Sequence, residues 1–267
     1  MLTTAEREAQ VALLDTAERN GVQTGLISGR HPDADLDDAY AIQAGWIKRK
    51  IEAGRRVIGW KIGLTSRAMQ SALNIETPDS GVLLDDMMFE DGAHIPAGRF
   101  IQPRIEAEIA FVMKTPLRGA DVGICDVLDA TAYVAPALEI LDTRIVRVDR
   151  ETGRARTVID TIADNAANAG IVLGGQAIRT GDVDMRWMGA IVSRNAVVEE
   201  TGLGAGVLNH PVRGIVWLVR RLAAYGQGID AGHVVLAGSF IRPIEARHGD
   251  TIVADYGPHG TLSCYFE

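Results

Sequence analysis

One short stretch, residues 102–111, constrains this chain more than any other. It reads Gln-Pro-Arg-Ile-Glu-Ala-Glu-Ile-Ala-Phe, and its alternating apolar residues have the period of a β-strand. The alternation places Glu106 and Glu108 side by side on a face that continues with Ala110 and Val112. Paired carboxylates repel each other unless a cation lies between them, and Mg²⁺ or Mn²⁺ prefers such oxygen ligands. The alternative is a surface strand with two exposed acids, because short motifs often occur by chance.

Length and composition restrict the class of protein. The chain has 267 residues, of which 47% are hydrophobic, so it can form one large domain or a core domain with an appendage. Its net charge of −8 argues against a nucleic-acid surface and against an anionic membrane. No apolar run has the length of a membrane span, and the first residues lack a signal-peptide pattern. We expect a cytoplasmic protein in which Cys125 and Cys264 are reduced core thiols.

The N-terminal region, residues 1–75, is predicted to be mainly helical. Thr3 and Glu6 have the spacing of a capping box, which starts a first helix. Asp35 can cap a second helix that ends at Gly54.

Residues 57–64 change to the period of a strand. There Lys61 shares a face with Gly59 and Gly63, where another backbone or a ligand can approach closely. The alternative is an edge-strand lysine that prevents aggregation. Asp79 follows a proline and precedes Ser-Gly, which predicts a turn, and turn aspartates commonly bond their own backbone.

A third acid comes later in the chain. Glu139 lies in a predicted strand, 134–142, with apolar neighbours on both sides, where an unpaired carboxylate is costly. The alternative is an acid at the end of a strand that pairs with Arg144. Residues 144–158 lack an apolar period and predict a surface loop, whereas the small and polar residues 164–168 indicate a pocket wall or a tight packing contact.

From residue 174 onward, short strands alternate with turns around one helix that begins at Pro211. The fold class is therefore α+β: the helical region 1–75 is followed by a mixed, mainly antiparallel β-roll, 76–267, and the two are expected to pack as one unit. The six histidines fall at unrelated loop positions, which argues against a zinc site.

Several segments occur in the order found in a known family. They are residues 59–65, 78–81, 103–108, 136–139 and 164–166. Over nearly its whole length the chain resembles the hydratase and decarboxylase branch of the fumarylacetoacetate hydrolase superfamily. The resemblance implies the β-roll of that superfamily's C-terminal domains, assembled as a homo-oligomer.

The resemblance also implies a metal centre. Glu106, Glu108 and Glu139 would hold Mg²⁺ or Mn²⁺, and Lys61 and Asp79 would be the catalytic residues that move protons and position water.

The implied activity is that of a lyase, a divalent-metal-dependent hydratase in the catabolism of aromatic compounds. Its small-molecule substrate would be a 2-hydroxy-2,4-dienoate with a second carboxylate, hydrated by ketonisation and conjugate addition. Segments 84–87, 165–170, 206–211 and 238–243 resemble members with a seven-carbon substrate. The alternatives are a 2-oxopent-4-enoate hydratase, a 4-oxalocrotonate decarboxylase, and a non-catalytic partner subunit of such an enzyme.

The second carboxylate of this substrate requires a cation. Arg242 is a candidate because its planar donor fork suits a carboxylate, although it could equally be a surface arginine. Ser239 and Asn165 are further predicted substrate contacts.

Overall fold

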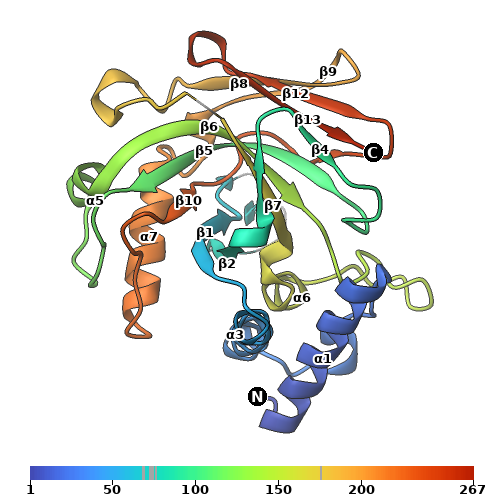
Figure 1. The fold of residues 1–267 in the computed structure, drawn as a ribbon. Coiled ribbons are helices and arrows are strands. Elements are labelled where there is room, and N and C mark those ends of the chain that lie inside the picture. Colours follow the sequence, from blue (N-terminus) through green and yellow to red (C-terminus); the bar gives the residue numbers. More distant parts are fainter. Residues whose placement is uncertain (68–69, 72–74, 76, 175) are drawn as a thin grey trace.

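The computed structural model describes residues 1–67, 70–71, 75, 77–174 and 176–267. The helices lie beside and below two β-sheets, and the N-terminal helices are grouped at one end of the molecule (Figure 1). The helices are α1 (Thr4–Asn20), α2 (Ile27–Arg30), α3 (Leu36–Glu52), α5 (Ile124–Ala130), α6 (Val158–Ala163) and α7 (Val212–Ala223). Short 3₁₀ turns include η1 (Asp85–Met87), η2 (Asn165–Ala167), η3 (Thr180–Asp182), η4 (Gly204–Gly206) and η5 (Gly257–His259).

The strands form two sheets. The larger has the order β2-β1-β10-β5-β6-β7-β3, with β11 paired to β5, and the smaller has the order β4-β13-β12-β8-β9. The strands of the larger sheet are β1 (Val57–Gly63), β2 (Asp79–Leu84), β3 (Met88–Glu90), β5 (Arg104–Met113), β6 (Thr131–Leu141), β7 (Asn168–Leu173), β10 (Val234–Leu236) and β11 (Ile244–Glu245). Those of the smaller sheet are β4 (Ala93–Ile95), β8 (Gly189–Arg194), β9 (Val197–Leu203), β12 (Thr251–Asp255) and β13 (Thr261–Phe266). The parallel pairs among the described strands are β1 with β10, β3 with β7 and β4 with β13. The prediction of an α+β fold with mixed, mainly antiparallel sheets is confirmed.

The predicted helix starts in the N-terminal region are confirmed. The Thr3 hydroxyl accepts a hydrogen bond from the Glu6 N–H, and the Glu6 carboxylate accepts one from the Thr3 N–H. Asp35 forms the equivalent box with Asp38 at the start of α3. Because both boxes satisfy N–H groups that a helix leaves free, they fix where α1 and α3 begin.

The strand predicted over residues 57–64 is confirmed as β1, which pairs with β2 and β10 and so belongs to the larger sheet.

The two faces of β5 pack differently. Ile105, Ala107, Ile109 and Phe111 lie in the main core, together with the buried stripe of α7 and the inner side chains of the smaller sheet. The opposite face contributes Ala110 to a smaller apolar cluster; its other buried members are Leu83, Ala137, Ile171, Val234 and Leu236. This second face is the one that carries Glu106 and Glu108, so these acids lie on the concave side of the rolled sheet.

Three local predictions are wrong. Asp79 is the first residue of β2 and not part of a turn, because its strand pairs with β1 as far as Gly63. Arg144 is the first residue of the segment predicted to be a surface loop, but it is buried. Its ion pair with Asp164 compensates its charge. Cys264 is buried as expected, whereas Cys125 is exposed in the first turn of α5.

Among the described helices, none is both long enough and apolar enough to span a bilayer.

Candidate metal centre

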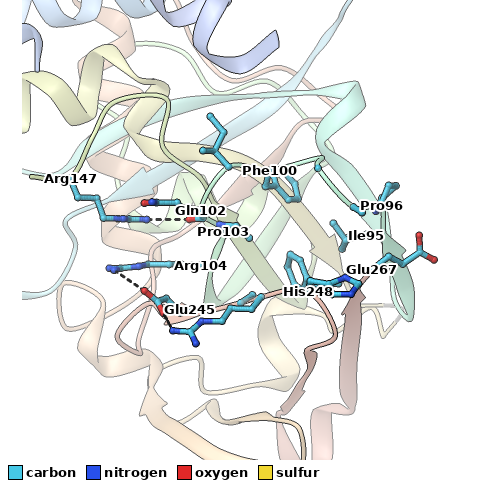
Figure 2. A pocket seen from close by; sticks show the side chains of 16 residues that line it. Ile95, Pro96, Phe100, Gln102, Pro103, Arg104, Arg147, Glu245, His248 and Glu267 are labelled. Atoms are coloured by element: carbon cyan, nitrogen blue, oxygen red, sulfur yellow. Dashed lines mark hydrogen bonds and ion pairs between the residues drawn. The ribbon is translucent and has the colours of Figure 1, made fainter. Parts of the chain in front are cut away.

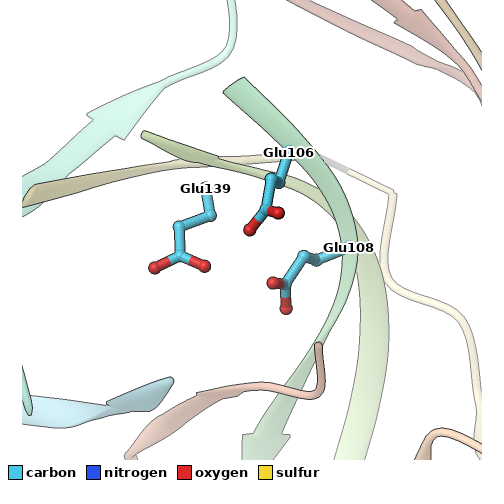
Figure 3. Close-up of side chains that lie close together, drawn as sticks. All are labelled: Glu106, Glu108 and Glu139. Atoms are coloured by element: carbon cyan, nitrogen blue, oxygen red, sulfur yellow. The ribbon is translucent and has the colours of Figure 1, made fainter. Parts of the chain in front are cut away.

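Three carboxylates meet on the concave face of the larger sheet. In the antiparallel pairing of β5 with β6, Glu106 lies opposite Glu139, and Glu108 lies opposite Ala137. One oxygen from each of Glu106, Glu108 and Glu139 lies within 4.8 Å of the others. Figure 3 shows the three side chains pointing into one space. The shared face predicted for the first two acids is confirmed, and the strand register adds the third.

The hydrogen bonds of the protein leave this cluster incomplete. Glu108 Oε2 accepts a hydrogen bond of 2.7 Å from the Gly238 N–H. Glu108 Oε1 and both Glu139 oxygens are buried, and the described residues offer them no hydrogen-bond partner. Buried polar atoms are normally satisfied, so these oxygens have the properties of ligands directed at an ion. An all-oxygen donor set fits Mg²⁺ or Mn²⁺.

The electrostatics lead to the same conclusion. Burial, and then the charge of Glu139, raise the pKa of Glu106 to about 8. Burial and the charges of both partners raise the pKa of Glu108 well above its usual range, and burial raises that of Glu139. Three ionised carboxylates therefore destabilise one another, and a divalent cation is the species that would let them stay ionised at neutral pH.

Lys61 supplies one positive charge beside the carboxylates. Its Nζ lies 3.5 Å from Glu139 Oε1, and the side chain is almost fully buried. Burial alone would lower the Lys61 pKa, but the charges of Glu139, Asp79 and the other two glutamates outweigh it and raise the pKa above its usual range. Lys61 is therefore charged unless a bound cation competes for the same carboxylates.

The glycine face of β1 is the reason Lys61 and Asp79 can approach each other. A Cβ at Gly63 would lie 2.2 Å from Asp79 Oδ1 and 2.9 Å from Lys61 Nζ, so a larger residue there would displace these two groups. Asp79 is buried, its Oδ1 has no hydrogen-bond partner among the described residues, and burial raises its pKa against the opposing effect of Lys61. The two residues expected to act in catalysis are thus neighbours beside the carboxylates.

Tyr256, for which no sequence pattern predicts a role, holds the carboxylate strands in register. Its hydroxyl lies 2.7 Å from the Ala137 carbonyl and 2.9 Å from the Glu108 carbonyl, and it accepts a 3.1 Å hydrogen bond from the Glu108 N–H. Because Tyr256 follows β12, it ties the smaller sheet to β5 and β6 at the point where the acids project.

The three predicted substrate contacts occupy different positions. Both polar atoms of the Asn165 amide bond the backbone of Val82 in β2, at 2.8 and 2.9 Å. Ser239 follows Gly238, whose N–H bonds Glu108, and the Ser239 hydroxyl lies 2.8 Å from the Ile241 carbonyl. The side chain of Arg242 is 80% exposed and pairs with Glu200 of β9 at 2.6 Å.

A separate cavity of about 560 Å³ opens where the start of β5 meets β11 and the C-terminal end of the chain (Figure 2). Arg104, Arg147 and Glu245 line it, but none of the three clustered glutamates is among its described lining residues. Arg104 pairs with Glu245 at 3.8 Å, and Arg147 donates to the Gln102 carbonyl at 3.3 Å. The metal centre and this cavity are therefore distinct.

Comparison with known proteins places the chain in a family. No protein-family model matches it. It is 53% identical to 2-oxo-hept-4-ene-1,7-dioate hydratase of Escherichia coli over 253 residues, which are 95% of each chain.

Solved structures agree with this. The structure resembles 4-oxalocrotonate decarboxylase from Pseudomonas putida G7 in complex with magnesium and adipate, with a TM-score of 0.93, 32% identity and coverage of 100% and 99% of the two chains. A fumarylpyruvate hydrolase from Pseudomonas aeruginosa in complex with Mn²⁺ and pyruvate has the same fold, with a TM-score of 0.60, 14% identity and coverage of 78% and 88%. The chain therefore belongs to the family of hydratases and decarboxylases that includes the Escherichia coli hydratase and the Pseudomonas putida decarboxylase.

Proposed function

We propose that this protein is a divalent-metal-dependent hydro-lyase that adds water to 2-hydroxyhepta-2,4-diene-1,7-dioate and forms 4-hydroxy-2-oxoheptane-1,7-dioate. The observation that carries the proposal is the cluster of Glu106, Glu108 and Glu139, in which one Glu108 oxygen and both Glu139 oxygens are buried without a hydrogen-bond partner and Lys61 lies 3.5 Å from Glu139. The choice of substrate is supported by the 53% identity to the seven-carbon hydratase, against 32% to the decarboxylase structure.

The proposed residue roles follow from where the side chains lie. Glu106, Glu108 and Glu139 would hold Mg²⁺ or Mn²⁺, which when bound supplies Lewis-acid stabilisation of the negative charge on the 2-oxo group. Lys61 lies 3.5 Å from a Glu139 oxygen, Asp79 lies beside Lys61, and both side chains are buried. They are the candidate groups for moving protons.

The proposed reaction has two stages. In the first, the proton of the 2-hydroxyl leaves and a proton is added at C5, which converts the dienol to a ketone with a double bond between C3 and C4. In the second, water adds across that bond, its hydroxyl to C4 and its remaining proton to C3. Each stage needs one group that accepts a proton and one that gives it. The adjacent Lys61 and Asp79 provide such a pair.

Two other functions compete with this proposal. A decarboxylase would use the same carboxylates and Lys61 on 2-oxohex-3-enedioate and release CO₂, which the likeness to the decarboxylase structure favours. A non-catalytic partner subunit would keep the fold without turnover. The unpartnered oxygens argue against the latter, because three buried like charges destabilise a protein that binds no metal.

An ultraviolet assay of dienol loss separates these functions. Purified protein with Mg²⁺ should consume the seven-carbon dienoate faster than the five-carbon one, release no CO₂ from 2-oxohex-3-enedioate, and lose activity with EDTA. CO₂ release as the faster reaction would favour the decarboxylase, and no turnover of any of these acids would overturn the enzyme proposal. We further propose that the protein acts in the cytoplasm as a homo-oligomer; light scattering tests its assembly.

A further inference from the structure

Arg156 is half-buried, and its guanidinium lacks the partners that a charged donor inside a protein normally has. Arg156 lies just before α6 and its backbone N–H bonds the Arg147 carbonyl at 2.9 Å, which fixes where the side chain starts. Its Nη1 is buried, and no described residue accepts a hydrogen bond from it. Leaving a buried charged donor unsatisfied is costly, so a site of this kind is expected to bind an anion that is not part of the protein.

The nearby carboxylates are already engaged or belong to the catalytic centre. Asp164 accepts hydrogen bonds from the N–H and Nε of Arg144. Asp160 accepts hydrogen bonds from Ser28 and from the Thr157 N–H. Asp79, whose charge also acts on Arg156, keeps a buried Oδ1 without a hydrogen-bond partner, and no ion pair joins the two groups among the described residues. Because Asp79 lies beside Lys61 at the metal centre, Arg156 is an unsatisfied cation whose charge acts on a residue of that centre.

Arg156 differs from the other arginines of this region. Arg104 and Arg147 line the outer cavity of Figure 2, where Glu245 and the Gln102 carbonyl are their partners. Arg221 also acts on Asp79 through its charge, but its guanidinium carbon lies 3.4 Å from the centre of the Tyr40 ring, which accounts for its position. Arg156 has no comparable contact among the residues that the structure describes.

We propose that Arg156 binds the distal carboxylate of the substrate and makes the enzyme selective for dicarboxylates. This inference rests on the proposed hydratase function, because a substrate held at the three glutamates by its 2-oxo acid end must place its far end elsewhere in the same site. A guanidinium fork is suited to that task, since it can give a carboxylate two parallel hydrogen bonds. Arg156 takes over the role expected of Arg242, which is exposed and paired with Glu200.

The test compares Arg156→Met with the matched control Arg221→Met on two dienoates. Loss of a charge-assisted contact should lower kcat/KM for the seven-carbon dicarboxylate by about 100-fold and change that for 2-hydroxypenta-2,4-dienoate by less than about threefold. Arg156→Lys should recover part of the loss, and Arg221→Met should preserve the ratio of the two substrates. A fall of equal size on both substrates, or selectivity lost in Arg221→Met and kept in Arg156→Met, would overturn the proposal.

A binding measurement separates failure of this inference from failure of the proposed function. Titration calorimetry with Mg²⁺ present compares 2-oxoheptanedioate with 2-oxopentanoate, neither of which has a double bond to hydrate. The wild-type protein should prefer the dicarboxylate and Arg156→Met should lose that preference, whether or not the enzyme turns over any dienoate. Equal preference in both proteins would show that Arg156 does not bind the distal carboxylate. Thermal melting shows whether Arg156→Met is folded, and if it is not, Arg156→Lys is used instead.

Discussion

Two groups of buried charges in this protein are built in opposite ways. Arg144 and Asp164 are both buried, and Arg144 satisfies its donors with the Asp164 carboxylate at 2.6 and 2.9 Å and with the carbonyls of Asp164 and Asn168. Its guanidinium also lies 5.1 Å from the Trp46 ring. By contrast, Glu108 and Glu139 are fully buried, and three of their oxygens have no hydrogen-bond partner among the described residues.

The difference separates structural charge from functional charge. A buried ion pair with every donor and acceptor satisfied holds two segments together, because removing either partner leaves the other buried and unpaired. A cluster of like charges with free oxygens does the reverse: it destabilises the fold until a ligand completes it. The two groups should therefore respond to mutation in opposite ways.

Removing one carboxylate of the cluster should have the largest effect on activity. Glu108→Gln and Glu139→Gln keep the shape of the side chain but remove a charge, so we expect turnover to fall by at least about 10³-fold, since a bound cation contributes several kcal/mol to such reactions. The folded protein should persist, because like-charge repulsion decreases. Steady-state rates and circular dichroism check both statements, with exposed Glu52→Gln as the control. Full activity in either variant would show that the substituted carboxylate is not part of the metal centre.

Removing Arg144 should have the largest effect on stability. Arg144→Met leaves Asp164 buried and unpaired, so the free energy of unfolding should fall by about 3–5 kcal/mol. Urea denaturation measures it. The matched control is Arg194→Met, because Arg194 pairs with Glu199 at 2.6 Å near the surface and should contribute at most about 1 kcal/mol. Equal losses in the two variants would mean that the buried pair has no special structural role.

Removing the positive charge of Lys61 should separate catalysis from metal binding. Lys61→Met should slow turnover by about 10²–10³-fold, as loss of a proton-transfer group does. Metal affinity should be kept or should rise, because Lys61 no longer competes with the cation for Glu139. Rates and calorimetric Mg²⁺ titration measure the two effects, and Lys48→Met, at an exposed lysine, is the control. Loss of metal binding in Lys61→Met would assign Lys61 a structural role instead.

Arg242 should give the smallest effect. Its exposed pair with Glu200 predicts that Arg242→Met changes the free energy of unfolding by less than about 1 kcal/mol. The ratio of activities on five-carbon and seven-carbon dienoates should stay within about threefold of the wild-type ratio. If that ratio collapses in Arg242→Met, the distal carboxylate is bound at Arg242 and not at Arg156.

The sequence was sufficient for the parts of the site that depend on local periodicity. Alternation alone puts Glu106 and Glu108 on one face of a strand, and the capping residues Thr3 and Asp35 locate two helices. The pairing of Glu106 with Glu139 is a matter of strand register, which a period of two cannot specify. It entered the prediction through the family resemblance.

Other residues could not have been identified locally because long-range packing determines their roles. Asp79 was predicted in a turn from its Pro-Asp-Ser-Gly context, but pairing with β1 extends it into a strand. Arg144 is buried and Arg156 is half-buried, yet both lie in a segment whose arginine-rich composition predicts a surface loop, and nothing in that composition separates these arginines from exposed ones. Tyr256 acts through three hydrogen-bond contacts to β5 and β6, which are far from it in the sequence.

Metal binding tests the central claim most directly. Titration calorimetry of Mg²⁺ and Mn²⁺ into metal-free wild-type protein should show one binding event per chain, and saturation at about 100 times the Kd should stabilise the fold by about 2.7 kcal/mol. Glu139→Gln should be folded and should lose both the binding and the stabilisation. Metal binding of unchanged affinity in Glu139→Gln, or none in the wild-type protein, would contradict the assignment of the buried glutamates as a metal centre.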